Sequence, residues 1–149
     1  MDANFDIRGD KEFLNAIGRV GRNTPGAIYN MVRNSCLLVE TRAKTHHLAG
    51  ATLQPRTHFL QRSVKTRVER QTNKVSGRVG SPVVYAAIHE YGGIIRPKNA
   101  QYLVFQIGGN WVRTKQVTMP ARRWLSQSAE DVKSQIERIF GREIELLIA

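Results

Sequence analysis

The segment Val79–Gly93, VGSPVVYAAIHEYGG, constrains the fold of this chain more than any other. Its extended beginning is interrupted at Ser81-Pro82, because proline fixes φ and has no N–H to donate to a sheet. The apolar stretch from Val83 to Ile88 then predicts a brief helix. Gly92-Gly93 ends that helix, since glycine accepts the left-handed conformation at helix ends. The segment therefore predicts a compact corner between two β-regions, with its aromatic and aliphatic side chains anchored in the core.

A β-hairpin is predicted on the N-terminal side of this corner, from Val64–Gln71 and Lys74–Gly80. Thr72-Asn73 between them suits a tight turn, because asparagine tolerates positive φ. A two-residue turn places small and apolar residues on one face and cations on the other. It also places Arg67 opposite Arg78, which costs stability unless an anion or Glu69 intervenes.

A second hairpin is predicted after the corner, from Tyr102–Ile107 and Trp111–Val117 around Gly108-Gly109. In this register Phe105 faces Val112, and Trp111 lies on the other face with the neighbouring cations.

Apolar periodicity predicts the helices. Thr24-Pro25 begins the longest one, which reaches about His47 with apolar residues at spacings of three and four. A short strand at Phe5-Asp6-Ile7 and a short helix over Asp10–Val20 precede it. Ser128–Asp131 resembles a capping box at the start of a C-terminal helix, which Gly141 bends or ends.

The order of elements predicts a single α+β domain over residues 1–149. We expect an antiparallel sheet of the two hairpins, packed against the long helix of the N-terminal half and the C-terminal helix.

Catalytic and metal-binding patterns are not found in the sequence. His46 and His47 would point about 100° apart on a helix and would not share one ion. His89-Glu90 resembles half of a zinc-protease motif but lacks the second histidine four residues later, so a structural histidine is the better interpretation. Cys36 falls on an apolar helix face. We therefore expect no catalytic residue, no metal and no cofactor.

The charge is the unusual part of the composition. Lys and Arg number 23 against 12 Asp and Glu, a formal net charge of +11. Such an excess favours a polyanionic partner or an acidic protein surface, although a basic solvated surface would also produce it. The densest tract, Arg62–Arg78, could serve a small protein that binds nucleic acid non-specifically. The N-terminus has no signal-peptide pattern, and no apolar run is long enough to span a membrane, so no membrane partner is expected.

Two short motifs in this sequence resemble those of tailed-bacteriophage tail-completion and virion-morphogenesis proteins, which act in the neck and in head–tail joining. The first is Val79-Gly80-Ser81 followed by Tyr85–Gly93, and the second is Pro120–Leu125, PARRWL. The second motif has Arg123 where that family usually has proline, and Trp124 at its aromatic position.

The layout of the chain is similar to that family over most of its length. A long basic helix, a hairpin, the first motif, a variable β insertion, the second motif and a final helix follow in the family's order. Phe59–Val64 matches only part of the usual lead-in to the hairpin, because the Thr-Gly is missing.

The resemblance implies a structural virion protein without enzymatic activity, a ring-forming tail-completion or tail-terminator subunit at the head–tail junction. Its partners would be further copies of itself, in a hexamer, together with neighbouring connector and tail-tube proteins and, non-specifically, passing DNA. Its location would be the tail or neck of the virion, after assembly in the host cytoplasm.

Three groups of residues are expected to carry this role. The motif corner comprises Tyr85, Ile88, His89, Glu90, Tyr91, Gly92 and Gly93. The subunit or partner interface comprises Trp111, Pro120, Arg122, Trp124 and Leu125. The basic residues facing a lumen or DNA are Arg62, Lys65, Arg67, Lys74 and Arg78. For Trp111 and Tyr102 both protein packing and base stacking are open, and packing is favoured because aromatic residues dominate interfaces.

Overall fold

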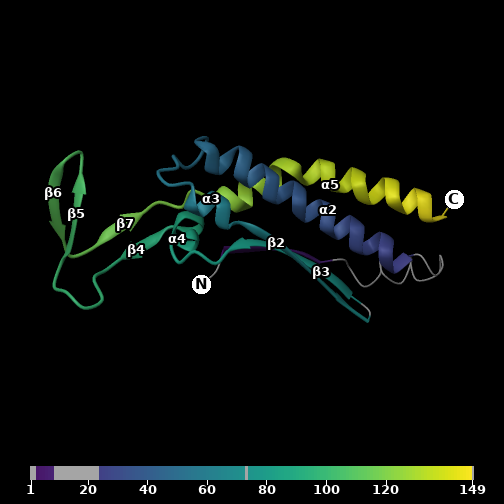
Figure 1. The fold of residues 1–149 in the computed structure, drawn as a ribbon, viewed down its shortest axis with the longest axis horizontal. Coiled ribbons are helices and arrows are strands. Elements are labelled where there is room, and N and C mark those ends of the chain that lie inside the picture. The colour runs from purple at the N-terminus through teal and green to yellow at the C-terminus, as the bar shows by residue number, and fades with distance from the viewer. Residues whose placement is uncertain (1–2, 9–23, 73, 149) are drawn as a thin grey trace.

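The computed structural model describes residues 3–8, 24–72 and 74–148, and these form an elongated α+β fold (Figure 1). Its helices are α2 (Thr24–Thr45), the 3₁₀ helix η1 (His47–Ala49), α3 (Phe59–Ser63), α4 (Ala86–Tyr91) and α5 (Trp124–Ile148). Its strands are β1 (Ala3–Arg8), β2 (Lys65–Gln71), β3 (Lys74–Ser81), β4 (Gly93–Ile95), β5 (Leu103–Ile107), β6 (Asn110–Thr114) and β7 (Val117–Met119). The predicted α+β class, the early strand and the long helix are confirmed. The short helix predicted over Asp10–Val20 lies outside the described residues.

The body of the molecule is an antiparallel sheet of β1, β3 and β2, in which β3 is the central strand. The first hairpin has its predicted register, with Thr66 opposite Val79 and Arg67 opposite Arg78. Residues of β3 alternate between buried and exposed, as expected for a sheet with one covered face. Arg67 Nε lies 3.0 Å from Glu69 Oε1, so a carboxylate does intervene beside the two facing arginines.

Helices α2 and α5 lie side by side and cover one face of this sheet (Figure 1). The predicted apolar stripe of α2 is confirmed, because the residues along it are buried: Ile28, Met31, Val32, Cys36, Val39 and Ala43. The helix approaches β3 most closely at Gly77, where a Cβ atom would lie 2.3 Å from Cys36 Sγ. Glycine is therefore required there for the helix to pack on the strand.

Helix α5 begins at Trp124, four residues before the predicted start at Ser128. Ser128 is buried inside the helix, and its hydroxyl donates to the Trp124 carbonyl oxygen at 2.6 Å. Gly141 does not end the helix, which continues to Ile148. Among the described helices, none has the length and apolar content needed to cross a membrane.

The second hairpin lies apart from the body, which differs from the single sheet expected from sequence. Among the described strands, β5 and β6 pair only with each other, and so do β4 and β7. The predicted register is confirmed, with Phe105 opposite Val112. We call residues 93–119 the arm; it projects from one end of the body (Figure 1). The separation follows from the corner, which redirects the chain away from the sheet before the second hairpin begins.

Candidate functional site

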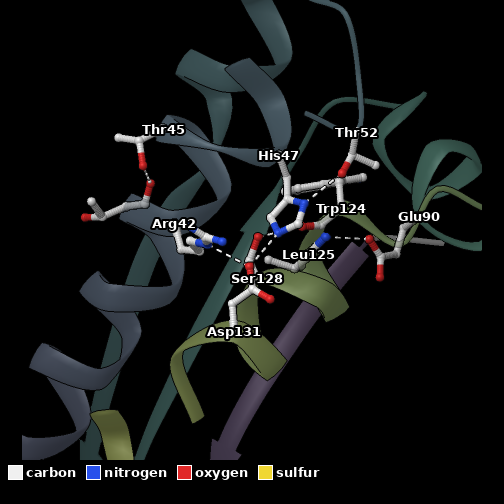
Figure 2. A network of polar contacts seen from close by, with 10 residues as sticks. Arg42, Thr45, His47, Thr52, Glu90, Trp124, Leu125, Ser128 and Asp131 are labelled. Carbon is white, nitrogen blue, oxygen red and sulfur yellow. Dashed lines mark hydrogen bonds and ion pairs between the residues drawn. The ribbon is translucent and has the colours of Figure 1, made fainter. Parts of the chain in front are cut away.

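The first motif holds the start of helix α5 through a buried carboxylate. Glu90, on α4, is only 1% exposed. Its two oxygens accept hydrogen bonds from the backbone N–H groups of Leu125 at 2.7 Å and Ser126 at 3.0 Å, and from the Ser126 hydroxyl. The first N–H groups of a helix have no partner within the helix, and negative charge is favoured at that end. Glu90 therefore caps α5 from a distant part of the chain, as Figure 2 shows for Leu125.

Three further contacts join the two motifs. The backbone N–H of Arg122 donates to the His89 carbonyl at 2.9 Å, and that of Arg123 donates to the Glu90 carbonyl at 3.1 Å. The Trp124 indole Nε1 donates to the Ala86 carbonyl at 3.3 Å. The two motifs that carry the family resemblance are therefore one structural unit, which we call the motif junction.

The structure corrects which residues of the motifs lie inside. Tyr85 and Tyr91, expected in the core, are 41% and 52% exposed, and Ile88 is half-buried. The buried positions of α4 are Ala86 and Glu90, which are four residues apart and so share one helix face.

The expected interface residues also divide between core and surface. Trp124 and Leu125 are buried in the core of their own chain, so neither offers a surface to a partner. Pro120 and Arg122 are exposed, and Trp111 is 72% exposed at the arm.

Gly92 and Gly93 lie next to the motif junction, at the point where the chain enters the arm and where it returns from it. Gly92 has φ 72° and ψ −175°, a backbone conformation that is essentially restricted to glycine. A Cβ atom at this position would lie 2.7 Å from the backbone N of Ala121 and 2.9 Å from the carbonyl oxygen of Met119. Gly93 begins β4, which pairs with β7 from Gly93↔Met119 onward. The junction thus fixes both ends of the arm at one point.

The arm carries an exposed apolar and basic surface. Val104, Ile107 and Trp111 are exposed large hydrophobic residues. The chain has no Asp or Glu from Tyr91 to Ala129, and the cations of the arm are Arg96, Lys98, Arg113 and Lys115. The Arg113 guanidinium lies 3.8 Å from the centre of the Tyr102 ring, a cation–π contact that covers one face of that ring.

The expected lumen or DNA-facing residues lie on or beside the open face of the sheet. Lys65 and Arg67 on β2, and Lys74 and Arg78 on β3, are exposed, and their register puts them on the face opposite α2. Arg62 is exposed on α3, where its guanidinium donates to the Thr57 carbonyl at 3.1 Å. The structure thus groups four of the five on one surface, which we call the basic face.

A cleft of about 390 Å³ opens beside the motif junction. Its lining includes Leu48, Leu53, Phe59, Tyr85 and His89. Burial, and next the nearby Arg122 charge, lower the pKa of His89 below its ordinary value of 6.5. The Tyr85 and His89 rings meet edge to face, with their centroids 5.9 Å apart. The structural role of His89 stays a prediction.

A polar network missed by the sequence links the end of α2 to α5. Asp131 Oδ2 accepts from Arg42 Nε at 2.6 Å and contacts His47 Nε2 at 3.0 Å, and His47 Nδ1 contacts the Thr52 hydroxyl at 2.7 Å (Figure 2). The hydrogen bond from Arg42, and then that from His47, lower the pKa of Asp131 below its ordinary value of 3.8. His47 begins η1, after α2 has ended at Thr45, and Asp131 is 84 residues away, so helical spacing gave no signal for the pair.

His46 lies within 4.8 Å of this pair, measured between ligand atoms, so the three could approach one ion. The guanidinium on Asp131 and the hydrogen bonds at both His47 nitrogens instead indicate a structural network.

Comparison with known proteins identifies the family to which this chain belongs. No curated protein and no solved structure matches the chain. Residues 19–145 match the model of one protein family, and this range includes α2, the corner, the arm, the motif junction and most of α5. The chain therefore belongs to the phage virion morphogenesis family.

Proposed function

We propose that this chain is a structural subunit that completes the phage tail by forming a ring at the head–tail junction, or neck. The observation that carries the proposal is the arm, which projects from one end of the body and leaves Val104, Ile107 and Trp111 exposed. Large apolar side chains gathered on a projecting element mark an interaction surface. The role is architectural, and it requires no catalytic residue or cofactor.

The shape of the molecule supports the proposed ring. When a projecting element at one end binds a surface elsewhere on the next copy, the interface is head-to-tail, and such interfaces close into rings or continue as filaments. Six copies, the number that the family resemblance implies, is the stoichiometry to test. The basic face would line the lumen, where its cations would contact passing DNA, and the flat surfaces of the ring would meet the connector and the tail tube.

Electron microscopy of particles made with and without the protein tests this role. We expect particles that lack it to appear as free heads beside separate tails, or with tails of irregular length. Complementation with the wild-type chain should restore joined particles, and Trp111→Asp should not. Gln135→Ala, at an exposed position of α5, is the matched control that should restore them. Joined, infectious particles in the absence of the protein would refute the proposal.

Non-specific DNA binding is the second candidate, and the exposed cations of the basic face favour it. It predicts that the purified chain binds free duplex with an affinity that falls steeply with salt concentration. Replacing both Lys65 and Arg67 by Gln should weaken binding equally for unrelated sequences and reduce the salt dependence. An absence of binding at low salt would eliminate this candidate without affecting the ring.

A further inference from the structure

One face of the hairpin of β5 and β6 combines an aromatic residue with a cation. Strand register puts Val104 and Arg113 opposite each other, and puts Trp111 opposite Gln106 on the same face. All four residues are exposed. A hairpin of only two strands is marginally stable in water, so β5 and β6 need a surface to pack against. The guanidinium over Tyr102 leaves that ring less available for base stacking, which favours a protein surface over a nucleic acid.

Helix α5 presents a surface with the complementary charge. Positions one turn apart along its outward side form a stripe of exposed residues without a cation: Glu130, Ser134, Glu137, Gly141 and Glu145. Lys133, Arg138 and Arg142 flank the stripe, and the Arg138 guanidinium bonds back to the Ser134 carbonyl at 3.3 Å. An acid-free arm and an outward line of carboxylates therefore occur on the same chain.

Gly141 gives an independent indication of contact on this stripe. Glycine inside a helix costs stability relative to alanine. A Cβ at Gly141 would meet nothing within 4 Å among the described residues, so packing against those residues does not require glycine. The open backbone there would let a large flat side chain approach closely.

The two surfaces match in spacing but lie too far apart to meet within one molecule. Trp111 and Arg113 are two residues apart on a strand, about 6.6 Å, and one helical turn from Gly141 to Glu137 or Glu145 rises about 6 Å. The arm projects from one end of the molecule, and the C-terminus of α5 lies at the other (Figure 1). Contact between them must therefore join two copies.

We infer that the arm of one subunit packs on α5 of the next, with Trp111 over Gly141 and Arg113 beside Glu137 or Glu145, one helical turn away. The inference rests on the proposed ring, and it names the two surfaces that meet. The interface is head-to-tail, as ring closure requires.

Mixing two complementary variants of the full chain tests this interface. Trp111→Asp removes the arm contact, and Gly141→Arg blocks the stripe with a bulky cation whose Cβ meets none of the described residues of its own subunit. Each variant alone should remain monomeric in light scattering after gel filtration, at concentrations where the wild type assembles. An equimolar mixture should form a dimer and nothing larger, because only one intact interface remains. Gln135→Ala should assemble as the wild type does. Circular dichroism of each variant verifies that it is folded.

Disulfide trapping detects the same contact when association is weak. The double variant Trp111→Cys with Gly141→Cys should give a covalent ladder of oligomers on oxidation. The same arm change paired with Gln135→Cys, on another side of α5, should not. Ladder formation supports the inference, and its absence at high protein concentration overturns it.

The outcomes separate this inference from the proposed function. If both single variants assemble like the wild type, or if Trp111→Asp abolishes only DNA binding, the inference is wrong and the ring is unaffected. If particles join normally without the protein, the proposed function fails whatever the purified chain does.

Discussion

Replacement of Glu90 tests how the corner and the C-terminal helix stabilise each other. Glu90→Ala removes the acceptor for the Leu125 N–H, the Ser126 N–H and the Ser126 hydroxyl. Each buried donor left without a partner costs about 1–3 kcal/mol. The Leu125 N–H is buried and water can reach part of Ser126, so we expect a loss of about 3 kcal/mol in the free energy of unfolding.

The conservative variant Glu90→Gln should lose less stability than Glu90→Ala does. Glu90→Gln keeps the side-chain volume and one carbonyl acceptor, but it places an NH₂ group against a donor and removes the negative charge from the helix N-terminus. We expect a loss of about 1–2 kcal/mol.

Urea unfolding followed by far-ultraviolet circular dichroism measures both losses. With a denaturant slope of about 1–3 kcal/mol per molar, a loss of 3 kcal/mol lowers the midpoint by about 1–3 M. Gln135→Ala is the control on the exposed side of the same helix and should change the midpoint little. If Glu90→Ala unfolds at the midpoint of this control, or is more stable than Glu90→Gln, the carboxylate does not cap α5.

Three further predictions follow from the junction and the polar network. Gly92→Val should cost about 1–3 kcal/mol in backbone strain, with the clash against Ala121 in addition, and should reduce both the unfolding midpoint and particle joining; a normal midpoint would contradict the strain. Arg123 has φ 48°, which proline cannot adopt, and its N–H is hydrogen-bonded. Arg123→Pro should therefore lower the free energy of unfolding by about 3 kcal/mol or more, whereas Arg123→Gly should be tolerated. Equal unfolding midpoints for the two variants would refute this backbone geometry. Because the pKa of Asp131 is lowered, the stability that its carboxylate contributes is complete above the ordinary value of 3.8 and is lost as the pH falls through the folded-state pKa. The stability difference between wild type and Asp131→Asn should therefore shrink toward pH 3. A constant difference between pH 7 and pH 3 would refute this contribution of the carboxylate.

The local sequence pattern was sufficient to predict the elements whose periodicity and strand pairing depend on residues close in sequence. The apolar spacing of α2 identified its buried face, because a helix repeats every 3.6 residues. Two-residue alternation and short turns fixed the register of both hairpins, including Arg67 opposite Arg78 and Phe105 opposite Val112. The two family motifs were also recognisable as sequence.

Which residues of the corner lie inside depended on a partner elsewhere in the chain. Hydrophobicity favoured Tyr85 and Tyr91 for the core, but the structure buries Ala86 and Glu90. A carboxylate is stable inside only when it is hydrogen-bonded, and its donors lie 35 and 36 residues away on α5. The same long-range cap explains why α5 begins at Trp124, ahead of the local signal at Ser128.

The sequence by itself thus determined the α+β class and the hairpin registers, because these depend on short-range periodicity and turn chemistry. It also contains the two motifs whose resemblance to the phage virion morphogenesis family indicated the family that the comparison shows. Only the tertiary structure decided that the motifs bind each other, that the second hairpin leaves the body as an arm, and that Asp131 meets His47. Those features depend on contacts between distant segments, and no local spacing encodes which distant group will satisfy a buried charge or an unpaired helix end.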